Sequence, residues 1–153
     1  MSSLESVDNE KFDAPVIGHF IDGQEVAGEG RMSDVFNPAR GVVSKKVALA
    51  GTDIYETAVV ACKNAFPAWR NTPPQKRAQI MFRFKQLLEE NADDICALIT
   101  DEHGKVLDDA RGELTRGIEV VEYACGISEL LKGQFSKNAG PNIDSWSEFQ
   151  PLG

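Results

Sequence analysis

The sequence has no long apolar run, few histidines and no surplus of positive charge, and each shortage excludes a class of protein. No stretch approaches the ~20 consecutive apolar residues that a membrane-spanning helix requires. Asp and Glu number 24 against 16 Lys and Arg, which gives a net charge of -8. Nucleic acids and anionic membranes both select for basic side chains, so we expect neither as a partner. The two histidines, His19 and His103, lie far apart and have no metal-ligand spacing around them.

Cysteine is scarce as well. The three thiols, at Cys62, Cys96 and Cys125, are widely spaced, and no Cys-x-x-Cys pair occurs. Residues 1–13 contain four acidic side chains and one lysine, unlike a secretory signal or a mitochondrial presequence. We therefore expect a cytoplasmic protein with reduced thiols, in which residues 1–15 form a flexible acidic arm.

The motifs that most often carry chemistry are missing. The sequence has no phosphate-binding pattern of the GxGxxG or GxxxxGK[ST] kind and no GxSxG nucleophile elbow. Each cysteine sits in a helical pattern with no base beside it, so we expect all three to serve packing rather than nucleophilic catalysis. The sequence thus predicts no catalytic, cofactor-binding or metal-binding residue in this chain.

Two polar clusters have a functional and a structural interpretation. The residues His103–Gly104–Lys105 would suit an anion-binding corner, but a helix stop with basic side chains near the C-terminal dipole is favoured. Glu113, Arg116 and Glu119 lie three residues apart, so they can pair along one helix surface. Both clusters are therefore interpreted as structural.

Residues 16–50 show a pattern that predicts short strands. They are expected at residues 16–21, 24–27, 32–36 and 42–50. Asp22–Gly23 is a strong hairpin turn signal, and Asn37–Pro38 initiates a further turn. The last apolar alternation, at 145–149, predicts a terminal strand after a segment, 134–143, that has no helical period.

Four helices fill the middle of the sequence. The first begins at a predicted cap, Asp53, and Pro67 is expected to end or kink it. The second has Thr72 as cap with Gln75 three residues later, and the third has Asn91 as cap and Gly104 as a left-handed stop. The fourth is predicted over 107–132, a rod of ~39 Å, opening near Asp108 and ending at Gly133. Its apolar stripe is longer than two small neighbouring helices can cover.

Several segments, in this order and spacing, resemble the opening of the aldehyde dehydrogenase superfamily. They are His19–Gly23, Phe36–Gly41, Ala65–Trp69, Pro74–Arg77 and Leu98–Lys105. A narrower resemblance, to the CoA-acylating methylmalonate-semialdehyde dehydrogenases, is carried by Arg116–Cys125, Asp144–Ser147 and Gln150–Gly153.

The resemblance implies an α/β fold, with small antiparallel strands followed by about four helices and a terminal strand. It implies a parent enzyme that uses NAD and coenzyme A to convert methylmalonate or malonate semialdehyde to propanoyl-CoA or acetyl-CoA with release of carbon dioxide. A cysteine thiolate in that family forms the acyl thioester that is passed to CoA. None of the three cysteines here matches the motif of that nucleophile, so the resemblance carries no catalytic role to this chain, and no cofactor is expected to bind it tightly.

On this resemblance, residues 16–153 are the N-terminal part of an NAD-binding domain, and residues 134–150 begin the strand that joins subunits. The expected partners are the remainder of the catalytic chain and further copies in a homo-oligomer. By itself the 153-residue chain is expected to be inactive and to expose an apolar patch. Two alternatives remain: a non-catalytic helical module that binds a partner protein, and an aldehyde dehydrogenase with another substrate.

Overall fold

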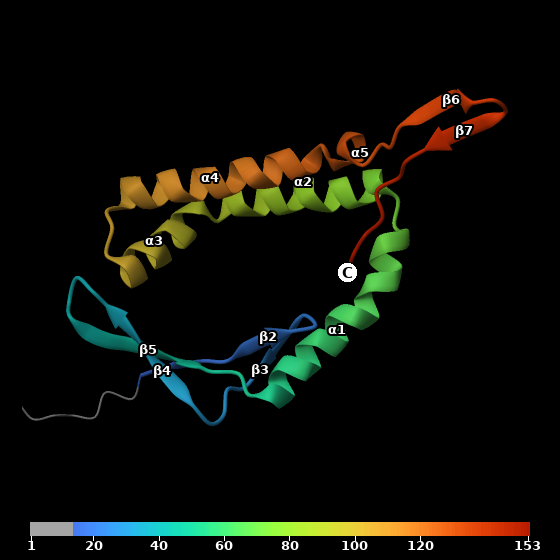
Figure 1. Ribbon diagram of the computed structural model, residues 1–153. Helices are drawn as coiled ribbons and strands as arrows, with labels where there is room; N and C mark the ends of the chain where they lie inside the picture. The colour runs from blue at the N-terminus through green and yellow to red at the C-terminus, as the bar shows by residue number, and fades with distance from the viewer. Residues whose placement is uncertain (1–13) are drawn as a thin grey trace, which may run out of the picture.

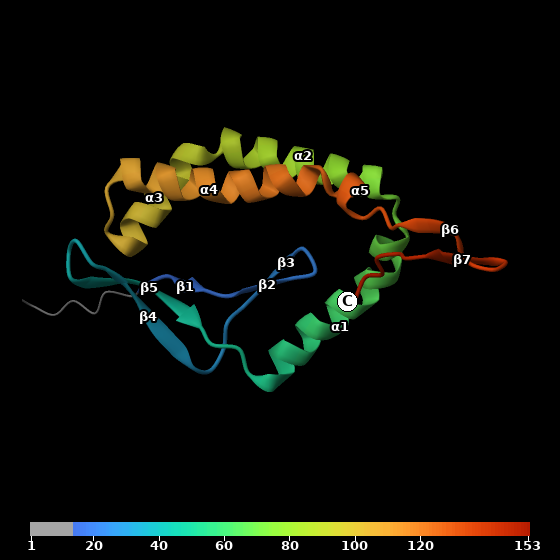
Figure 2. The ribbon, with the colours of Figure 1, turned by 45° about the horizontal axis from the view of Figure 1, so that its top comes forward.

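The computed structural model describes residues 14–153, so the predicted acidic arm lies outside the described residues except for Ala14 and Pro15. Figures 1 and 2 show α2 and α4 side by side in one layer, with α3 at one end of it. The strands β1, β4 and β5 lie below this layer (Figure 2), and α1 runs from the strands to the start of α2 (Figure 1). The hairpin β6–β7 projects from the other end of the helical layer.

Three strands form the larger sheet, in the order β1-β5-β4. Their bounds are Val16–Ile17 for β1, Met32–Asn37 for β4 and Val42–Ala48 for β5. β4 and β5 are antiparallel, as expected, whereas β1 pairs with β5 in parallel, a pairing that the sequence did not predict. The crossover arises because the chain leaves β1 to form a separate hairpin before it returns to the sheet.

That separate hairpin consists of β2 (His19–Ile21) and β3 (Gln24–Val26). Its turn is the predicted one, with positive φ angles at Asp22 and Gly23. The single strand predicted over 16–21 is instead divided at Gly18. A Cβ atom on Gly18 would lie only 2.4 Å from the carbonyl oxygen of Val26, so the backbone crosses here at a distance that only glycine allows.

The helices are α1 (Thr52–Asn71), α2 (Pro74–Glu90), α3 (Ala92–His103), α4 (Leu107–Cys125) and α5 (Ile127–Leu130). Their number and order agree with the prediction, except that the fourth predicted rod is divided. α4 ends at Cys125, about 28 Å from its start, and α5 begins after Gly126. The Gly126 amide donates to the carbonyl of Tyr123 at 3.1 Å, so the last turn tightens and the helix stops there.

The predicted side-chain caps are wrong. Gly51 precedes α1 and Pro73 precedes α2, and neither helix has a side-chain cap hydrogen bond. Asp53 lies in the first turn of α1, where its charge still complements the helix dipole. Thr72 ends α1 instead, and its hydroxyl donates to the carbonyl of Ala68 at 2.9 Å.

Two further helix ends also differ from their prediction. Pro67 lies inside α1 and does not end it, because the helix continues to Asn71. Asn91 stands at the predicted junction, but its side-chain amide donates backwards to the carbonyl of Leu87 at 2.7 Å. It therefore satisfies the end of α2 rather than the start of α3. The start of α4 at Leu107 agrees with the prediction, and Asp108 lies in its first turn.

The C-terminal hairpin contains one strand that the sequence did not predict. β6 (Phe135–Gly140) pairs with β7 (Ile143–Trp146), in place of the single strand expected at 145–149. β6 is interrupted by an irregularity in register and by a positive φ at Asn138. Because of these irregularities, β6 lacks the alternation of apolar and polar residues by which a strand is predicted from sequence.

The packed interior is small. The buried apolar residues are Ala14, Ala48, Ala78, Cys96, Ala110 and Cys125. Many large apolar side chains are exposed instead, among them Phe20 at 74% and Trp146 at 72%. Much apolar surface of the described residues therefore faces water.

Part of this exposed apolar surface forms stripes along two helices. The α1 stripe consists of Tyr55, Val59, Cys62, Phe66 and Trp69. The α2 stripe consists of Ile80, Phe84 and Leu87, which are 53%, 45% and 40% exposed. α1 contains no buried residue at all. Among the residues that the structure describes, no helix is both long and apolar enough to cross a lipid bilayer.

Gly104 ends α3 in the left-handed conformation that the sequence predicted, with φ +84°. Its amide donates to the carbonyl of Thr100 at 2.8 Å. A Cβ atom at this position would lie 2.8 Å from Cγ of Pro38, in the turn between β4 and β5. The end of α3 thus meets the sheet at a point with no room for a side chain.

We predict that Gly104→Ala lowers the free energy of unfolding by about 1–2 kcal/mol, because it combines a strained φ with a clash. Gly112→Ala is the matched control, since Gly112 lies inside α4 with nothing within 4 Å of its added methyl group. It is expected to stabilise the protein by up to about 1 kcal/mol. Urea unfolding followed by circular dichroism measures both, and equal effects would contradict the assigned contact.

Candidate functional site

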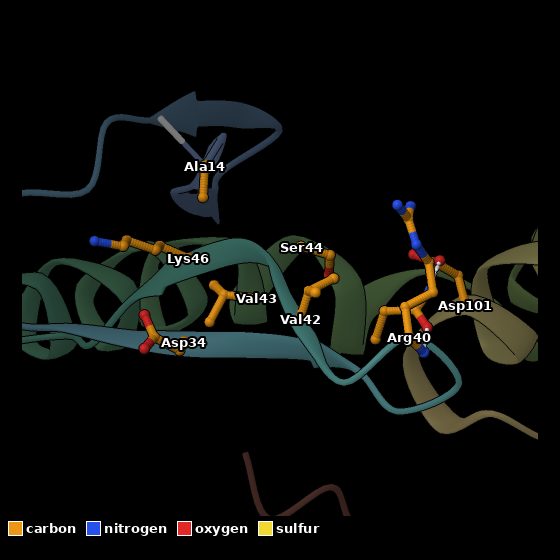
Figure 3. A pocket seen from close by; sticks show the side chains of 9 residues that line it. Ala14, Asp34, Arg40, Val42, Val43, Ser44, Lys46 and Asp101 are labelled. Atoms are coloured by element: carbon orange, nitrogen blue, oxygen red, sulfur yellow. Dashed lines mark hydrogen bonds between the residues drawn. The ribbon is translucent and has the colours of Figure 1, made fainter. Parts of the chain in front are cut away.

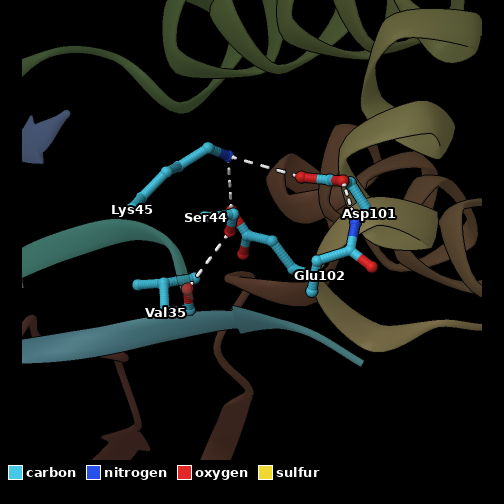
Figure 4. Close-up of polar contacts among 6 residues, drawn as sticks. Val35, Ser44, Lys45, Asp101 and Glu102 are labelled. Carbon is cyan, nitrogen blue, oxygen red and sulfur yellow. Dashed lines mark hydrogen bonds and ion pairs between the residues drawn. The ribbon is translucent and has the colours of Figure 1, made fainter. Parts of the chain in front are cut away.

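The most concentrated polar cluster joins α3 to the sheet (Figure 4). The side-chain amide of Asn37 donates to Oδ1 of Asp101 at 2.6 Å. Nζ of Lys45 lies 3.2 Å from Oε1 of Glu102 and 3.9 Å from Oδ2 of Asp101. One amide and one ammonium on the strands thus hold two adjacent carboxylates on the last turn of α3.

The turn between β4 and β5 prepares these groups. Oδ1 of Asn37 accepts a hydrogen bond from the amide of Arg40 at 3.1 Å, which closes the turn with a side chain. The hydroxyl of Ser44 donates to the carbonyl of Val35 at 3.1 Å, across the two strands (Figure 4). Both interactions fix the strand end on which Asn37 and Lys45 stand.

A cavity of about 720 Å³ lies beside this cluster (Figure 3). Its lining combines apolar and charged side chains: Ala14, Asp34, Asn37, Arg40, Val42, Val43, Ser44, Lys46 and Asp101. Figure 3 shows Asp34 and Lys46 toward one end and Arg40 with Asp101 toward the other. Its volume falls within the range of small-molecule sites.

The chemistry of this cavity is limited. No histidine or cysteine lines it, and the hydroxyl of Ser44 is already a donor to a backbone carbonyl. A nucleophile with an adjacent base is therefore lacking. The lining contains no glycine-rich loop that could cradle a dinucleotide, so the residues here do not fit NAD. The cluster and its cavity are a junction between two structural units.

Two of the three cysteines have the packing role that the sequence predicted. Cys96 and Cys125 are buried, as a packing role requires. Cys62 is exposed, so the prediction that it packs in the interior is wrong for the described chain. The reason is local to α1, which contains no buried residue.

The corner at His103–Lys105 has the structural role that the sequence favoured. Lys105 forms an ion pair and a hydrogen bond with Glu113 in the next helix, so its ammonium is already engaged. This contact also corrects the predicted pairing along α4, since Glu113 reaches back to Lys105 rather than to Arg116. The hydrogen bond from Lys105, with its positive charge, holds the pKa of the Glu113 carboxyl below its usual value.

Other ion pairs lie on the helix surfaces. Lys85 pairs with Glu89 one turn along α2 at 2.6 Å, and this hydrogen bond raises the pKa of the lysine. Arg111 on α4 reaches Asp93 on α3 at 2.8 Å. Within residues 14–153, His, Cys, Asp and Glu side chains form no group of three that could hold a metal ion. The charged side chains of the described residues therefore form separate ion pairs and no metal-binding cluster.

The sequence is similar to known proteins over most of its length. The sequence profile of the aldehyde dehydrogenase family matches residues 26–153. The chain is 59% identical over 135 residues to the malonate-semialdehyde dehydrogenase of Pseudomonas aeruginosa, covering 88% of this chain and 27% of that one. It is 40% identical over 136 residues to the mitochondrial, acylating methylmalonate-semialdehyde dehydrogenase of Arabidopsis thaliana, covering 89% and 22%.

Solved structures give the same picture. The crystal structure of a methylmalonate-semialdehyde dehydrogenase from Oceanimonas doudoroffii superimposes with a TM-score of 0.88 at 61% identity, over 90% of this chain and 28% of that one. A structure from Sinorhizobium meliloti with the same enzyme name, solved with NAD, gives 0.89 at 46% identity over 92% and 29%. The chain thus spans between a fifth and a third of the length of these relatives and matches their N-terminal segment.

Removal of the Asn37 side chain tests the junction. We predict that Asn37→Ala lowers the free energy of unfolding by about 1–2 kcal/mol, because Asp101 and the Arg40 amide each lose a partner. Asn64→Ala on α1 serves as control, since Asn64 forms no side-chain hydrogen bond in the described part of the chain, and a change within about 0.5 kcal/mol is expected. Denaturant titration that finds the two variants alike would argue against the junction.

The ion pair of Lys105 has a pH signature. Because the folded-state pKa of Glu113 is depressed, its contribution to stability is present above the ordinary glutamate pKa and is lost as the pH falls through the folded-state value. Lys105→Gln should move the pKa of Glu113 up toward the ordinary value of about 4.3, measured by NMR titration of the side chain. Lys132→Gln, which removes a pair at Glu129, should leave it in place.

Proposed function

Because the chain belongs to the aldehyde dehydrogenase family, we propose that it contributes the N-terminal segment of an NAD-dependent, CoA-acylating dehydrogenase of malonate or methylmalonate semialdehyde. The single observation that carries this proposal is the 59% identity to a malonate-semialdehyde dehydrogenase, sustained over 88% of this chain. The structural match to a methylmalonate-semialdehyde dehydrogenase at 61% identity supports the same substrate class.

The cofactors follow from the relatives rather than from residues of this chain. One relative was solved with NAD, and another carries the word acylating in its name, which supports a thiol acceptor such as coenzyme A. The described residues do not fit a nucleotide, so no step of the reaction is assigned to them. The catalytic thiol, the nucleotide site and the CoA site belong to the part of the enzyme that this chain does not match.

The role proposed for residues 16–153 is structural support of that remainder. The α1 and α2 stripes expose apolar side chains in regular rows, as surfaces that lie against another layer do. The exposed hairpin β6–β7, with Phe135 at 64% and Trp146 at 72% exposure on paired positions, is proposed to extend a sheet between subunits of a homo-oligomer. A cytoplasmic location is proposed with it.

A second candidate function is a non-catalytic module that binds a partner protein through its exposed apolar surface. The specific observation in its favour is that surface itself, because patches of this kind mark interaction sites. The two candidates differ in whether the segment functions as part of a polypeptide that turns over an aldehyde.

An activity assay separates them. NADH formation from malonate and methylmalonate semialdehyde, each with and without coenzyme A, is measured for the 153-residue chain and for a polypeptide that continues it to the length of its relatives. We expect turnover that requires CoA in the longer polypeptide and none in the 153-residue chain. Turnover by the 153-residue chain would contradict the supporting role, and inactivity of the folded longer polypeptide with both aldehydes would favour the binding module.

A further inference from the structure

Two residues, Thr72 and Pro73, connect α1 to α2 and are called here the α1–α2 joint. Figure 1 shows that the two helices meet at a bend, so that α1 leads away from the helical layer toward the strands. The bend at this joint therefore helps to decide where the strands lie relative to the helical layer.

Few backbone torsions are free to vary in the joint. The ring of Pro73 fixes its own φ and confines Thr72 before it to the extended region, where Thr72 has φ -71° and ψ 126°. The amide of Thr72 donates to the carbonyl of Trp69 at 3.1 Å, which ties the joint to the end of α1. The carbonyl of Pro73 accepts from the amide of Lys76 at 2.9 Å, which ties the joint to α2. A single side-chain contact across the joint is therefore enough to select its bend.

Arg77 supplies such a contact. Its Cζ atom lies 5.9 Å from the centre of the Trp69 ring, so a guanidinium on the first turn of α2 covers an indole on the last turn of α1. At this distance a cation is attracted by the face of the ring. Within residues 14–153, Arg77 takes part in no ion pair, and its Nε is buried without a hydrogen-bond partner. Among the described residues, the indole is therefore the group that stabilises this charge.

The charge of Arg77 stands where α2 alone disfavours it. The first turn of a helix is the positive end of its dipole, and α2 has no acidic residue there. The same guanidinium lies over the last turn of α1, which is the negative end of that helix. A bend that brings the end of α1 to Arg77 therefore offsets the unfavourable position of the charge in α2.

A second contact of the same type does not cross the joint. Cζ of Arg70 lies 5.6 Å from the centre of the Phe66 ring, and both residues belong to α1. They are four residues apart, so this contact stabilises the helix without orienting it. The two contacts differ in whether they join two helices, which makes Arg70 a control for Arg77.

We propose that Arg77 and Trp69 form a clamp that fixes the bend between α1 and α2. The superposition on the dehydrogenase from Oceanimonas doudoroffii covers 90% of this chain with a TM-score of 0.88, so the same bend occurs in that much longer chain. Both members of the clamp belong to residues 14–153, and the clamp orients α1 without contacts from a longer polypeptide. This inference does not depend on the proposed enzymatic function.

Two spin labels across the joint measure its bend. Cys62 is exposed on α1, whereas Cys96 and Cys125 are buried, so a nitroxide reacts with Cys62 and with a second site, Gln86→Cys, on the exposed surface of α2. We expect a single narrow distribution of label distances by pulsed electron paramagnetic resonance. Arg77→Met keeps a long stem and removes the charge, and it should broaden this distribution at least about twofold.

Arg70→Met is the matched control, because it removes the same side chain from a ring contact inside α1, and it should leave the label distances unchanged. Arg77→Lys keeps a cation over the ring and should retain most of the narrow distribution. A narrow distribution in Arg77→Met, or equal broadening in Arg77→Met and Arg70→Met, would overturn the clamp. Equal broadening in Arg77→Lys and Arg77→Met would overturn the role assigned to the charge.

The fluorescence of Trp69 gives a readout without labels. The sequence has two tryptophans, so Trp69 alone remains in a Trp146→Phe background. In that background Arg77→Met should raise the constant for quenching by acrylamide about twofold, because the covered face of the indole opens to water. Quenching that Arg77→Met leaves unchanged would contradict the contact.

Trp69→Leu removes the other member of the clamp and keeps Arg77 in place. It should broaden the label distances as Arg77→Met does, which tests the clamp independently if Arg77→Met reduces the helix content measured by circular dichroism. Label distances that stay narrow in Trp69→Leu would overturn the proposal.

Discussion

The constraint on which the rest of this structure depends is the apolar surface that residues 14–153 leave uncovered. α1 has no buried residue, and each member of the α2 stripe is at least 40% exposed. The buried residues are alanines and cysteines, small side chains that contribute little apolar area to the interior. The fold is therefore a set of well-formed secondary structures whose large side chains still require a partner surface.

Because little apolar surface is buried, one polar junction fixes how the sheet lies against the helices. At the end of α3, the Asn37–Asp101 hydrogen bond and the Lys45 ion pairs meet the close approach of Gly104 to Pro38. A hydrogen bond to a charged group is directional, so this junction fixes orientation where little apolar burial is available to do so. It holds the sheet against the helical layer in the arrangement that the aldehyde dehydrogenase relatives share.

Sequence patterns predicted those features that depend on neighbouring residues. The left-handed stop at Gly104 and the turn at Asp22–Gly23 are set by local backbone sterics, and both were predicted correctly. The predicted caps Asp53 and Thr72 failed by one or two residues, since Gly51 precedes α1 and Pro73 precedes α2. The parallel pairing of β1 with β5 and the strand β6 depend on distant partners or irregular register, which periodicity does not report. The exposure of Cys62 was missed for the related reason that an apolar stripe shows what a helix can bury, not whether anything covers it.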